Sequence, residues 1–429
     1  MSERWRSTYV EVHLPHLVHN FKLLKSCVAE SALFCPMVKA DAYGHGDIEV
    51  AQAIERHGPI TFGVALVEEG VKLRRAGIQS QILVFGTFDH DGAEASVNFN
   101  LIPVLSTWDH IGAFERALGE GDHAPVHIKF NTGMSRLGFE PQEAPKLAAH
   151  FKGQGRMRLG GVATHLLNGG DYGVGAGSSE KQEKLFSEIF SHFKDTSAVG
   201  HYLNSSAILT RPNTKMGARP GIALYGAMPP TSDQIRAHLL PVMSWKSALG
   251  LVRKVPKGAT VSYDGTWTAK RESWIGLVPV GYADGYGRAF NNKGVMLFRG
   301  KRCPVAGIVC MDYTLLDLTG AVADGEPKAG EEIVILGKQG GEQLKVEELA
   351  SMTGTISYEI MTRLGARVPM LIGSVGLVLG LLLPAVFPVL PALLVSAALF
   401  GLSYIFYHVA VQNLVGTISR EADRARNFN

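Results

Sequence analysis

The chain has 429 residues, which is long for one ordinary domain, so two domains and an appended segment are expected. Its 42 basic and 39 acidic residues nearly balance, and no basic run is interleaved with aromatic residues, which argues against a nucleic-acid partner. The four cysteines lack metal-ligand spacing and are too few for a disulfide framework. A reducing, cytoplasmic setting therefore fits the main body of the chain.

The first half of the chain alternates short apolar runs with amphipathic stretches. Strands are predicted at Phe34–Val38, Phe62–Ala65, Ile82–Phe85, Ile102–Leu105, Val126–Phe130 and Leu159–Thr164. Helices are predicted between them at Ile48–Arg56, Val67–Ala76, His110–Leu118 and Lys181–Phe193. Repeated strand–helix alternation is typical of parallel strands joined by crossover helices. We assign residues 8–238 to an α/β domain, a closed (β/α)8 TIM barrel.

Residues 239–370 have a different pattern and predict a second, mainly β domain. Its apolar runs are separated by glycine and charged turns. Strands are predicted at Ala248–Val255, Trp274–Val280, Lys301–Ile308 and Glu332–Leu336, with one helix at Val346–Met352.

Lys39 directly follows an apolar strand, within the segment VKADAYGHG at 38–46. A buried ammonium group is unfavourable unless it is paired or chemically converted. At the C-terminal end of a barrel strand, Lys39 would face the active-site mouth, where a lysine can form a Schiff base. Lysines at strand ends are more often simply exposed, so Lys39 alone indicates little.

Further segments follow in a fixed order. They are KFNTGMSRLG at 129–138, TH at 164–165, NSS at 204–206, RPGIALYG at 219–226, SY at 262–263, GYADG at 281–285, CMD at 310–312 and SYE at 357–359. In this order and spacing, they resemble the alanine racemases over residues 8–370. The single pieces are modest signals, whereas the ordered set is very specific.

The resemblance implies an isomerase that uses pyridoxal 5'-phosphate (PLP) to interconvert L- and D-alanine, supplying D-alanine for peptidoglycan in the cell wall. Lys39 would hold PLP and serve as one acid–base group. Tyr263 would be the other, reaching in from the partner subunit of a homodimer with shared active sites. Racemisation removes the Cα proton from one face and returns it to the other, so two groups on opposite sides suffice. Burial and neighbouring charges are expected to lower the pKa of Lys39.

The resemblance also implies roles for residues around the cofactor and the substrate. Arg219 would face the pyridine nitrogen and keep it unprotonated, because arginine stays charged. His165 would pack against the ring, and Arg136 would bind the phenolic oxygen and the substrate. Lys129 matches a lysine that is often carbamylated. The phosphate would lie among Tyr43, Ser205, Gly221, Ile222 and Tyr358; Met311 would bind the substrate carboxylate through its backbone N–H, and Tyr282 would line the substrate's path.

Three positions depart from the family pattern. Asp264 follows Tyr263 where glycine is usual, and its charge would disfavour a tyrosinate. Leu166 replaces a common aromatic residue, and Asn131 replaces a usual aspartate. None of these changes removes a group that the mechanism needs. The other histidines, including His45, His123, His127 and His201, show no metal-ligand spacing, and neither a metal nor any other site is assigned to them.

Two other functions compete with racemisation of alanine. One is a related PLP decarboxylase or broad-specificity racemase on the same barrel. Decarboxylases place a carboxylate where Arg219 stands, and a broad-specificity relative would be exported, although no secretory signal is recognised here. The other is a PLP-binding module without catalysis, which would lack the second domain that carries Tyr263.

Residues 371–412 form a hydrophobic stretch that predicts a membrane anchor. Residues 368–419 contain no Asp, Glu, Lys or Arg. Two apolar runs, Leu371–Phe387 and Ala392–Gln412, are separated by prolines, and arginines flank both sides. A transmembrane hairpin in the inner membrane, with a polar tail at 413–429 and the catalytic domains in the cytoplasm, is favoured over a single crossing. A buried helix pair is less compatible with the lack of a polar face.

Overall fold

The computed structural model describes residues 6–152, 155–170, 177–211, 214–228, 238–323 and 325–364. These residues belong to two compact units. The barrel unit consists of Tyr9–Lys246 and Val334–Tyr358, and the β unit consists of Met1–Thr8, Ser247–Ile333 and Glu359–Asn429, each in its described part. The predicted membrane segment, 371–412, and the polar tail, 413–429, lie outside the described residues. Of the helices that are described, none is long and apolar enough to cross a membrane.

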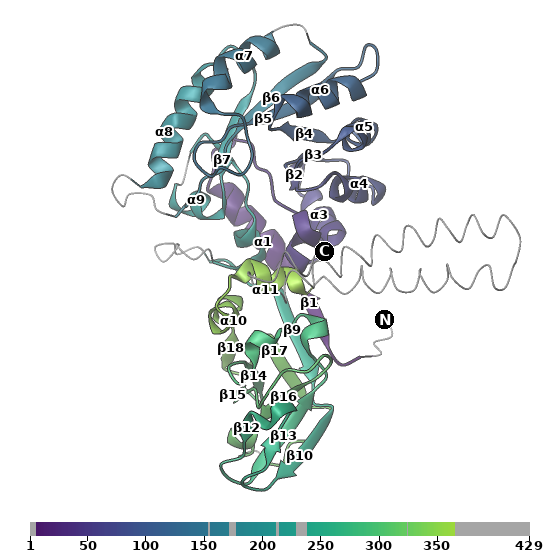
Figure 1. The fold of residues 1–429 in the computed structure, drawn as a ribbon, viewed down its shortest axis with the longest axis vertical. Coiled ribbons are helices and arrows are strands. Elements are labelled where there is room, and N and C mark those ends of the chain that lie inside the picture. The colour runs from purple at the N-terminus through teal and green to yellow at the C-terminus, as the bar shows by residue number, and fades with distance from the viewer. Residues whose placement is uncertain are drawn as a thin grey trace, which may run out of the picture. The chain divides into compact units, whose positions relative to one another are not determined.

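The barrel unit is built on a parallel sheet of seven strands in sequential order, β2 to β8 (Figure 1). The strands are β2 (Thr61–Val64), β3 (Gln81–Val84), β4 (Ile102–Leu105), β5 (Ala124–Lys129), β6 (Met157–Ala163), β7 (Val199–Leu203) and β8 (Gly217–Ala218). β2 and β4 are buried at every position, as expected of strands covered on both faces. β4 coincides with its predicted range, and β2, β3, β5 and β6 lie within two residues of theirs.

Residues 34–38 close this sheet by bonding to both of its edges. Phe34 forms a parallel bridge with Ala218 of β8, and Met37 forms one with Gly63 of β2. Backbone bonds of 2.8 Å join the Cys35 N–H to the Ala218 carbonyl and the Val38 N–H to the Gly63 carbonyl. The predicted strand Phe34–Val38 therefore lies between β8 and β2, and the eight segments form a barrel-like ring.

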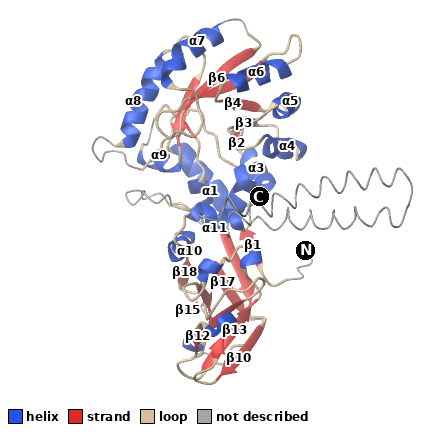
Figure 2. Ribbon diagram, in the orientation of Figure 1, coloured by secondary structure: helices blue, strands red, loops and turns tan. Residues whose placement is uncertain are grey.

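Helices surround these strands (Figure 2). They are α1 (Leu14–Ser26), α2 (Lys39–Gly44), α3 (Asp47–Glu55), α4 (Val67–Arg75), α5 (His90–Asn98), α6 (Trp108–Ala117), α7 (Ala144–Lys152), α8 (Ser178–Ser191) and α9 (Ser205–Thr210). Late in the chain, α10 (Val346–Thr353) lies beside β18 (Glu342–Leu344) (Figure 1). The short helix η2 (Ile222–Tyr225) follows β8. The four helices predicted between the strands are confirmed as α3, α4, α6 and α8, whereas α1, α2, α5, α7 and α9 were not predicted.

The chain enters the barrel unit through β1 (Tyr9–Val12), which pairs antiparallel with β9 (Met243–Ala248). β17 (Glu332–Gln339) is the next strand of the same sheet after β9 and pairs with β18 (Glu342–Leu344). The β unit is mainly β structure, as predicted. It contains an antiparallel sheet of β10 (Leu251–Val255), β13 (Ser273–Val278) and β16 (Thr314–Asp317), and a hairpin of β14 (Val295–Phe298) and β15 (Lys301–Pro304).

A two-stranded ribbon in the β unit, β11 (Thr260–Val261) with β12 (Trp267–Thr268), is connected by the loop that carries Tyr263. Val261 and Trp267 from this ribbon pack on a core with Ile275 and Ala306. The loop is thereby anchored at both of its ends. α11 (Ser357–Arg363) is the last described helix of the chain.

Candidate active site

Lys39 lies at the end of the strand-like segment 34–38, directly after the bond between Val38 and Gly63. The C-terminal ends of barrel strands form the mouth where active sites are found. Burial and the nearby charge of Arg136 lower the pKa of Lys39, while Glu69 acts in the opposite direction. The sequence-based expectation of a lysine with a lowered pKa is met.

The segment after Lys39 is a left-handed turn. Ala40, Asp41, Ala42 and Tyr43 have φ values between 51° and 57°, although none of them is glycine. This conformation costs roughly 1–2 kcal/mol per residue for L-amino acids. It persists only where surrounding contacts determine it, and such strain is typical of functional sites. The turn directs Tyr43 into the interior, where it is 5% exposed.

Four cations lie close enough to influence one another: Lys39, Lys129, Arg136 and Arg219. Lys129 ends β5 and is buried, and it has no ion-pair partner among the described residues. Burial, followed by the charges of Arg219, Arg136 and Lys39, lowers the pKa of Lys129 to about 8. A recess beside it is lined by residues that include Lys129, Arg136 and His165. Clustered positive charge of this kind favours a negatively charged ligand.

Arg219 is buried and hydrogen-bonded to uncharged acceptors. Its Nη1 donates to Nδ1 and to the backbone carbonyl of His201, both at 2.7 Å, and its Nη2 donates to the Thr164 carbonyl at 2.6 Å. Burial lowers its pKa to about 10, so it remains a cation at neutral pH. In the part of the chain that the structure describes, Arg219 has no carboxylate partner.

The hydrogen-bond chain continues from His201 to His127. Because a guanidinium group only donates, Nδ1 of His201 accepts, and its Nε2–H therefore donates to Nδ1 of His127 at 2.9 Å. Burial and Arg219 lower the pKa of His127 to about 3, so the ring is neutral. Neither histidine was predicted to contribute to the site, because no metal-ligand spacing marks them.

His165 follows β6 and lies next to Arg219, whose Nη2 is 3.4 Å from its Nδ1. Burial, and then Arg219, lower the pKa of His165 to about 3. Its backbone carbonyl accepts the side-chain amide of Gln182 at 3.1 Å. Leu166, a departure from the family pattern, is 1% exposed and fills the core behind the site.

A second group of predicted residues gathers where α9 and η2 begin. The Ser205 hydroxyl accepts the N–H groups of Gly221 and Ala223 at 2.9 and 3.2 Å. The ring of Tyr43 lies 5.9 Å from that of Tyr358. Burial raises the pKa values of both tyrosines, so both hydroxyls stay protonated and are able to donate. Hydroxyls and backbone N–H groups at the starts of these elements suit a phosphate.

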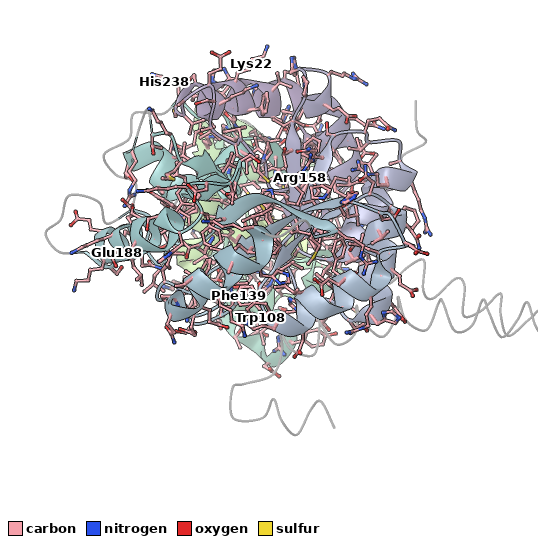
Figure 3. All side chains as sticks on the ribbon, turned by 90° about the horizontal axis from the view of Figure 1, so that it is seen from above. Lys22, Trp108, Phe139, Arg158, Glu188 and His238 are labelled. Carbon is pink, nitrogen blue, oxygen red and sulfur yellow. The ribbon has the colours of Figure 1, made fainter. Side chains whose placement is uncertain are left out.

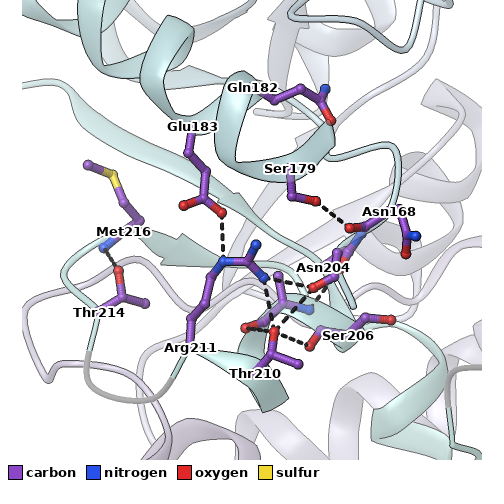
Figure 4. A network of polar contacts seen from close by, with 12 residues as sticks. Asn168, Ser179, Gln182, Glu183, Asn204, Ser206, Thr210, Arg211, Thr214 and Met216 are labelled. Carbon is purple, nitrogen blue, oxygen red and sulfur yellow. Dashed lines mark hydrogen bonds and ion pairs between the residues drawn. The ribbon is translucent and has the colours of Figure 1, made fainter. Parts of the chain in front are cut away.

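A polar network fixes α9, whose first residue is Ser205 (Figure 4). Nε of Arg211 pairs with Glu183 of α8 at 2.6 Å, and Nη1 donates to the Gly169 carbonyl at 2.7 Å. The side chain of Asn204 caps α9 by accepting the Ala207 N–H at 3.0 Å. Both ends of this short helix are therefore held by side chains.

Arg136 is presented by a loop closed by backbone bonds between Asn131 and Phe139 and between Phe139 and Lys129. Within the loop, Oδ1 of Asn131 accepts the N–H groups of Gly133 and Ser135 at 3.2 and 2.9 Å. One oxygen makes both bonds, so asparagine serves where the family usually has aspartate. Trp108 packs edge-on against Phe139 at 5.8 Å and anchors the end of the loop (Figure 3).

Tyr263 and Met311 lie on the surface of the β unit, 68% and 54% exposed. Within one chain, therefore, neither side chain is buried in a pocket. Asp264 follows Tyr263 with a φ of 58°, in the left-handed region that favours glycine. The usual family glycine at this position therefore has a conformational reason, and aspartate is among the residues that tolerate it best.

The Tyr282 loop packs on the backbone that carries Met311. The N–H groups of Tyr282 and Ala283 donate to the carbonyls of Cys310 and Met311 at 3.1 and 3.0 Å. A Cβ atom at Gly281 would lie 2.2 Å from the Met311 carbonyl oxygen, so only glycine fits. These contacts hold the GYADG and CMD segments together within the β unit.

Comparison with known proteins gives the family. Two family models match: the alanine racemase N-terminal domain over residues 12–229 and the C-terminal domain over residues 242–372. An alanine racemase from Carboxydothermus hydrogenoformans is 38% identical over 85% of this chain and 99% of its own. One from Thermodesulfovibrio yellowstonii is 37% identical over 84% of this chain and 96% of its own.

Solved structures agree with these relatives. The alanine racemase of Clostridium difficile 630 has a TM-score of 0.77 at 30% identity, covering 85% of this chain and 95% of its own. That of Streptomyces coelicolor A3(2) has a TM-score of 0.77 at 32% identity, covering 84% and 97%. With both family models matched in sequence order and relatives covered over nearly their whole length, this chain belongs to the alanine racemase family.

Proposed function

We propose that the protein interconverts L- and D-alanine with PLP as its cofactor, and that Lys39 and Tyr263 are the two acid–base groups. D-Alanine made in this way supplies peptidoglycan. The observation that carries the proposal is the position of Lys39, at the barrel mouth near three further cations. The phosphate and phenolic oxygens of PLP would supply negative charge to this cluster of cations.

The described residues fit PLP at both of its ends. Gly221 leaves room for the Tyr43 hydroxyl, because a Cβ atom there would lie 2.5 Å from that oxygen. Tyr43, Ser205, Gly221, Ile222 and Tyr358 would hold the phosphate. Arg219 would face the pyridine nitrogen, His165 would pack against the ring, and Arg136 would bind the phenolic oxygen.

Lys39 moves a proton at Cα of the substrate. PLP, when bound, withdraws electrons from Cα and makes its hydrogen acidic. Since burial and Arg136 lower the pKa of Lys39, more of the amine is neutral and able to accept that proton at working pH. Arg219, which stays charged, would face the pyridine nitrogen and would keep it unprotonated. Electron withdrawal would then be limited, and prompt return of the proton would be favoured.

Lys129 is proposed to carry a carbamate. With its pKa lowered to about 8, part of the amine is neutral at pH 7–8 and nucleophilic. Its nitrogen adds to the carbon of CO2, one proton leaves the nitrogen, and a carboxylate results. This anion would pair with Arg136, which has no other ion-pair partner among the described residues, and would orient it toward the substrate.

Tyr263, Met311 and Tyr282 are proposed to complete the active site of a second copy in a homodimer. Tyr263 would move the proton on the opposite face of Cα, and Met311 would bind the substrate carboxylate through its N–H. The exposure of Tyr263 and Met311 on a single chain supports this assignment, because exposed large side chains often mark a contact surface.

The test of the function is D-alanine formation from L-alanine by the purified full chain supplied with PLP, with Lys39→Ala and Tyr263→Phe as variants. We expect racemisation in the wild type and its loss in Lys39→Ala. A Tyr263→Phe protein that still racemises alanine at the wild-type rate would remove Tyr263 from the mechanism. A wild type that binds PLP but forms no D-alanine would move the function to another amino acid.

Residues 371–412 are proposed to anchor the enzyme in the inner membrane as a hairpin, with the catalytic units in the cytoplasm. The support is sequence composition: residues 368–419 lack Asp, Glu, Lys and Arg, and the C-terminal family match ends at residue 372. Cell fractionation of the full chain and of a version ending at Met370 tests this anchor. Recovery of the full chain in the soluble fraction would refute it.

A further inference from the structure

One side chain of α4 holds the left-handed turn after Lys39. Oε1 of Glu69 accepts the Ala40 N–H at 2.6 Å. Oε2 of the same carboxylate accepts the N–H groups of Ala65 and Leu66 at 2.7 and 3.0 Å. Glu69 therefore joins the residue after Lys39 to the segment that follows β2.

Two of these three contacts are local, and the third is not. Glu69 is the third residue of α4, where a glutamate satisfies the free N–H groups at a helix start. The contact with Ala40 spans 29 residues and does not contribute to the N-terminal cap of α4. The left-handed backbone begins at Ala40, which has a φ of 51°. A residue other than glycine keeps this conformation only where surrounding contacts stabilise it, and the bond from Glu69 is such a contact.

The other side-chain contacts of the turn lie farther from Lys39. Nδ1 of His45 bonds the carbonyls of Ala42 and Tyr43 at 3.0 and 3.1 Å. Lys72 pairs with Asp41 at 3.1 Å, but both side chains are more than 40% exposed, and such surface pairs contribute little. The bond from Glu69 is charge-assisted and lies closest to Lys39, so it has the most direct influence on where the lysine lies.

We propose that Glu69 is a positioning residue, which fixes the backbone of Ala40 and thereby directs Lys39 and Tyr43 to the two ends of the PLP site. The inference rests on the proposed PLP site and deepens it. Without the carboxylate, the turn relaxes toward the ordinary right-handed region. Lys39 then loses its fixed direction, and Tyr43 leaves the phosphate end.

The test uses the full chain with Glu69→Gln, and Glu68→Gln as its matched control. Glutamine keeps the size of the side chain but offers one acceptor oxygen, so the Ala40 and Ala65 bonds cannot both persist. Glu68 is the preceding residue of α4 and is exposed, so its variant loses the same charge from the same helix turn. The readouts are hydrogen exchange of the peptide 38–46 and PLP titration by visible absorbance.

We expect Glu69→Gln to speed exchange in 38–46 and to weaken PLP binding about tenfold, as for one lost bond to a charged group, while Glu68→Gln changes neither. Unchanged exchange and PLP affinity in Glu69→Gln would overturn the proposal. Faster exchange confined to α4, with exchange of 38–46 and PLP affinity unaffected in both Glu69→Gln and Glu69→Asp, would also overturn it, because Glu69 would then be only a cap.

Two other outcomes, a Glu69→Gln variant that does not fold and a wild type that makes no D-alanine, are interpreted as follows. If Glu69→Gln does not fold, Glu69→Asp replaces it, since aspartate keeps the charge at the helix start but is too short to reach Ala40. Weaker PLP binding in Glu69→Asp supports the proposal, and wild-type binding overturns it. If the wild type makes no D-alanine, yet exchange and PLP affinity respond as expected, the positioning role stands and the proposed reaction fails.

Discussion

Replacing Gly221 with alanine tests how tightly Tyr43 is held at the proposed phosphate end of the site. A Cβ atom at position 221 would lie 2.5 Å from the Tyr43 hydroxyl oxygen and 3.1 Å from its Cζ. Tyr43 has little freedom to turn away, because its ring packs on those of Tyr225 and Tyr358 at 5.0 and 5.9 Å. Restoring an ordinary contact requires a movement of about 1 Å, and overpacking of this kind costs about 1–3 kcal/mol.

We therefore expect Gly221→Ala to lower the stability of the cofactor-free protein by about 1–3 kcal/mol, and to weaken PLP binding about tenfold or more where the displaced hydroxyl contacts phosphate. Urea unfolding measures the first effect, and PLP titration by visible absorbance measures the second. Gly320→Ala is the matched control, since nothing lies within 4 Å of a Cβ atom placed there.

A double-mutant cycle with Tyr43→Phe isolates the clash. Removal of the hydroxyl leaves Cζ, at 3.1 Å, as the nearest Tyr43 atom, so Gly221→Ala should cost much less stability in the Tyr43→Phe background. The reasoning is refuted if Gly221→Ala costs the same in both backgrounds, or if it costs nothing in the wild type.

Three other predictions follow from backbone strain and buried titratable groups. Asp264→Gly should raise stability slightly, by about 0.5 kcal/mol, because relief of left-handed strain outweighs the added flexibility of the unfolded chain; a lower urea midpoint would contradict this. Burial holds the pKa of Lys129 at about 8 against the usual 10.5, so the unfolded chain binds more protons in this window. The stability of cofactor-free protein in CO2-free buffer should rise from pH 8 to 10.5, and Lys129→Met should remove that rise; an equal rise in both proteins would count against a buried, unpaired amine. Burial also lowers the pKa of His127 from 6.5 to about 3, so stability should fall as the pH drops through that range. His127→Gln should make this fall shallower in acid titrations followed by circular dichroism, and an unchanged slope would refute the assignment.

Hydrophobic periodicity predicted most of the barrel unit because its strands are buried runs flanked by amphipathic helices. β4 and α4 lie where the pattern places them, to within one residue. α1 was missed because its buried face includes Asn20, a polar residue that interrupts the apolar pattern. The Asn20 amide is satisfied by the carbonyls of Leu224 and Leu240, which are more than 200 residues away.

The conformation after Lys39 could not be predicted from local sequence. Ala40 and Ala42 are strong formers of right-handed helices. Their left-handed state is imposed by contacts from elsewhere, including the Glu69 carboxylate, 29 residues downstream of Ala40. The motif identified Lys39 and Tyr43 as residues that act together, and the structure shows the unusual backbone that connects them.

The contact between His127 and His201 could not be predicted from the sequence either, because it depends on strand register. His127 on β5 and His201 on β7 are separated by the intervening strand β6, yet their rings meet at 2.9 Å. They meet because β6 has glycine at position 161, opposite His127, where a Cβ atom would lie 2.4 Å from the His127 ring nitrogen. Without a side chain at 161, the imidazoles reach across β6 inside the barrel.

The contact between His127 and His201 has an electrostatic consequence, because His201 is also an acceptor for Arg219. Arg219 needs acceptors for its buried N–H groups, and a carboxylate would satisfy them while cancelling its charge. The neutral His201 ring and backbone carbonyls satisfy them without cancelling it. The retained charge helps to lower the pKa values of Lys129 and His165, so one glycine on β6 indirectly favours the neutral form of the Lys129 amine.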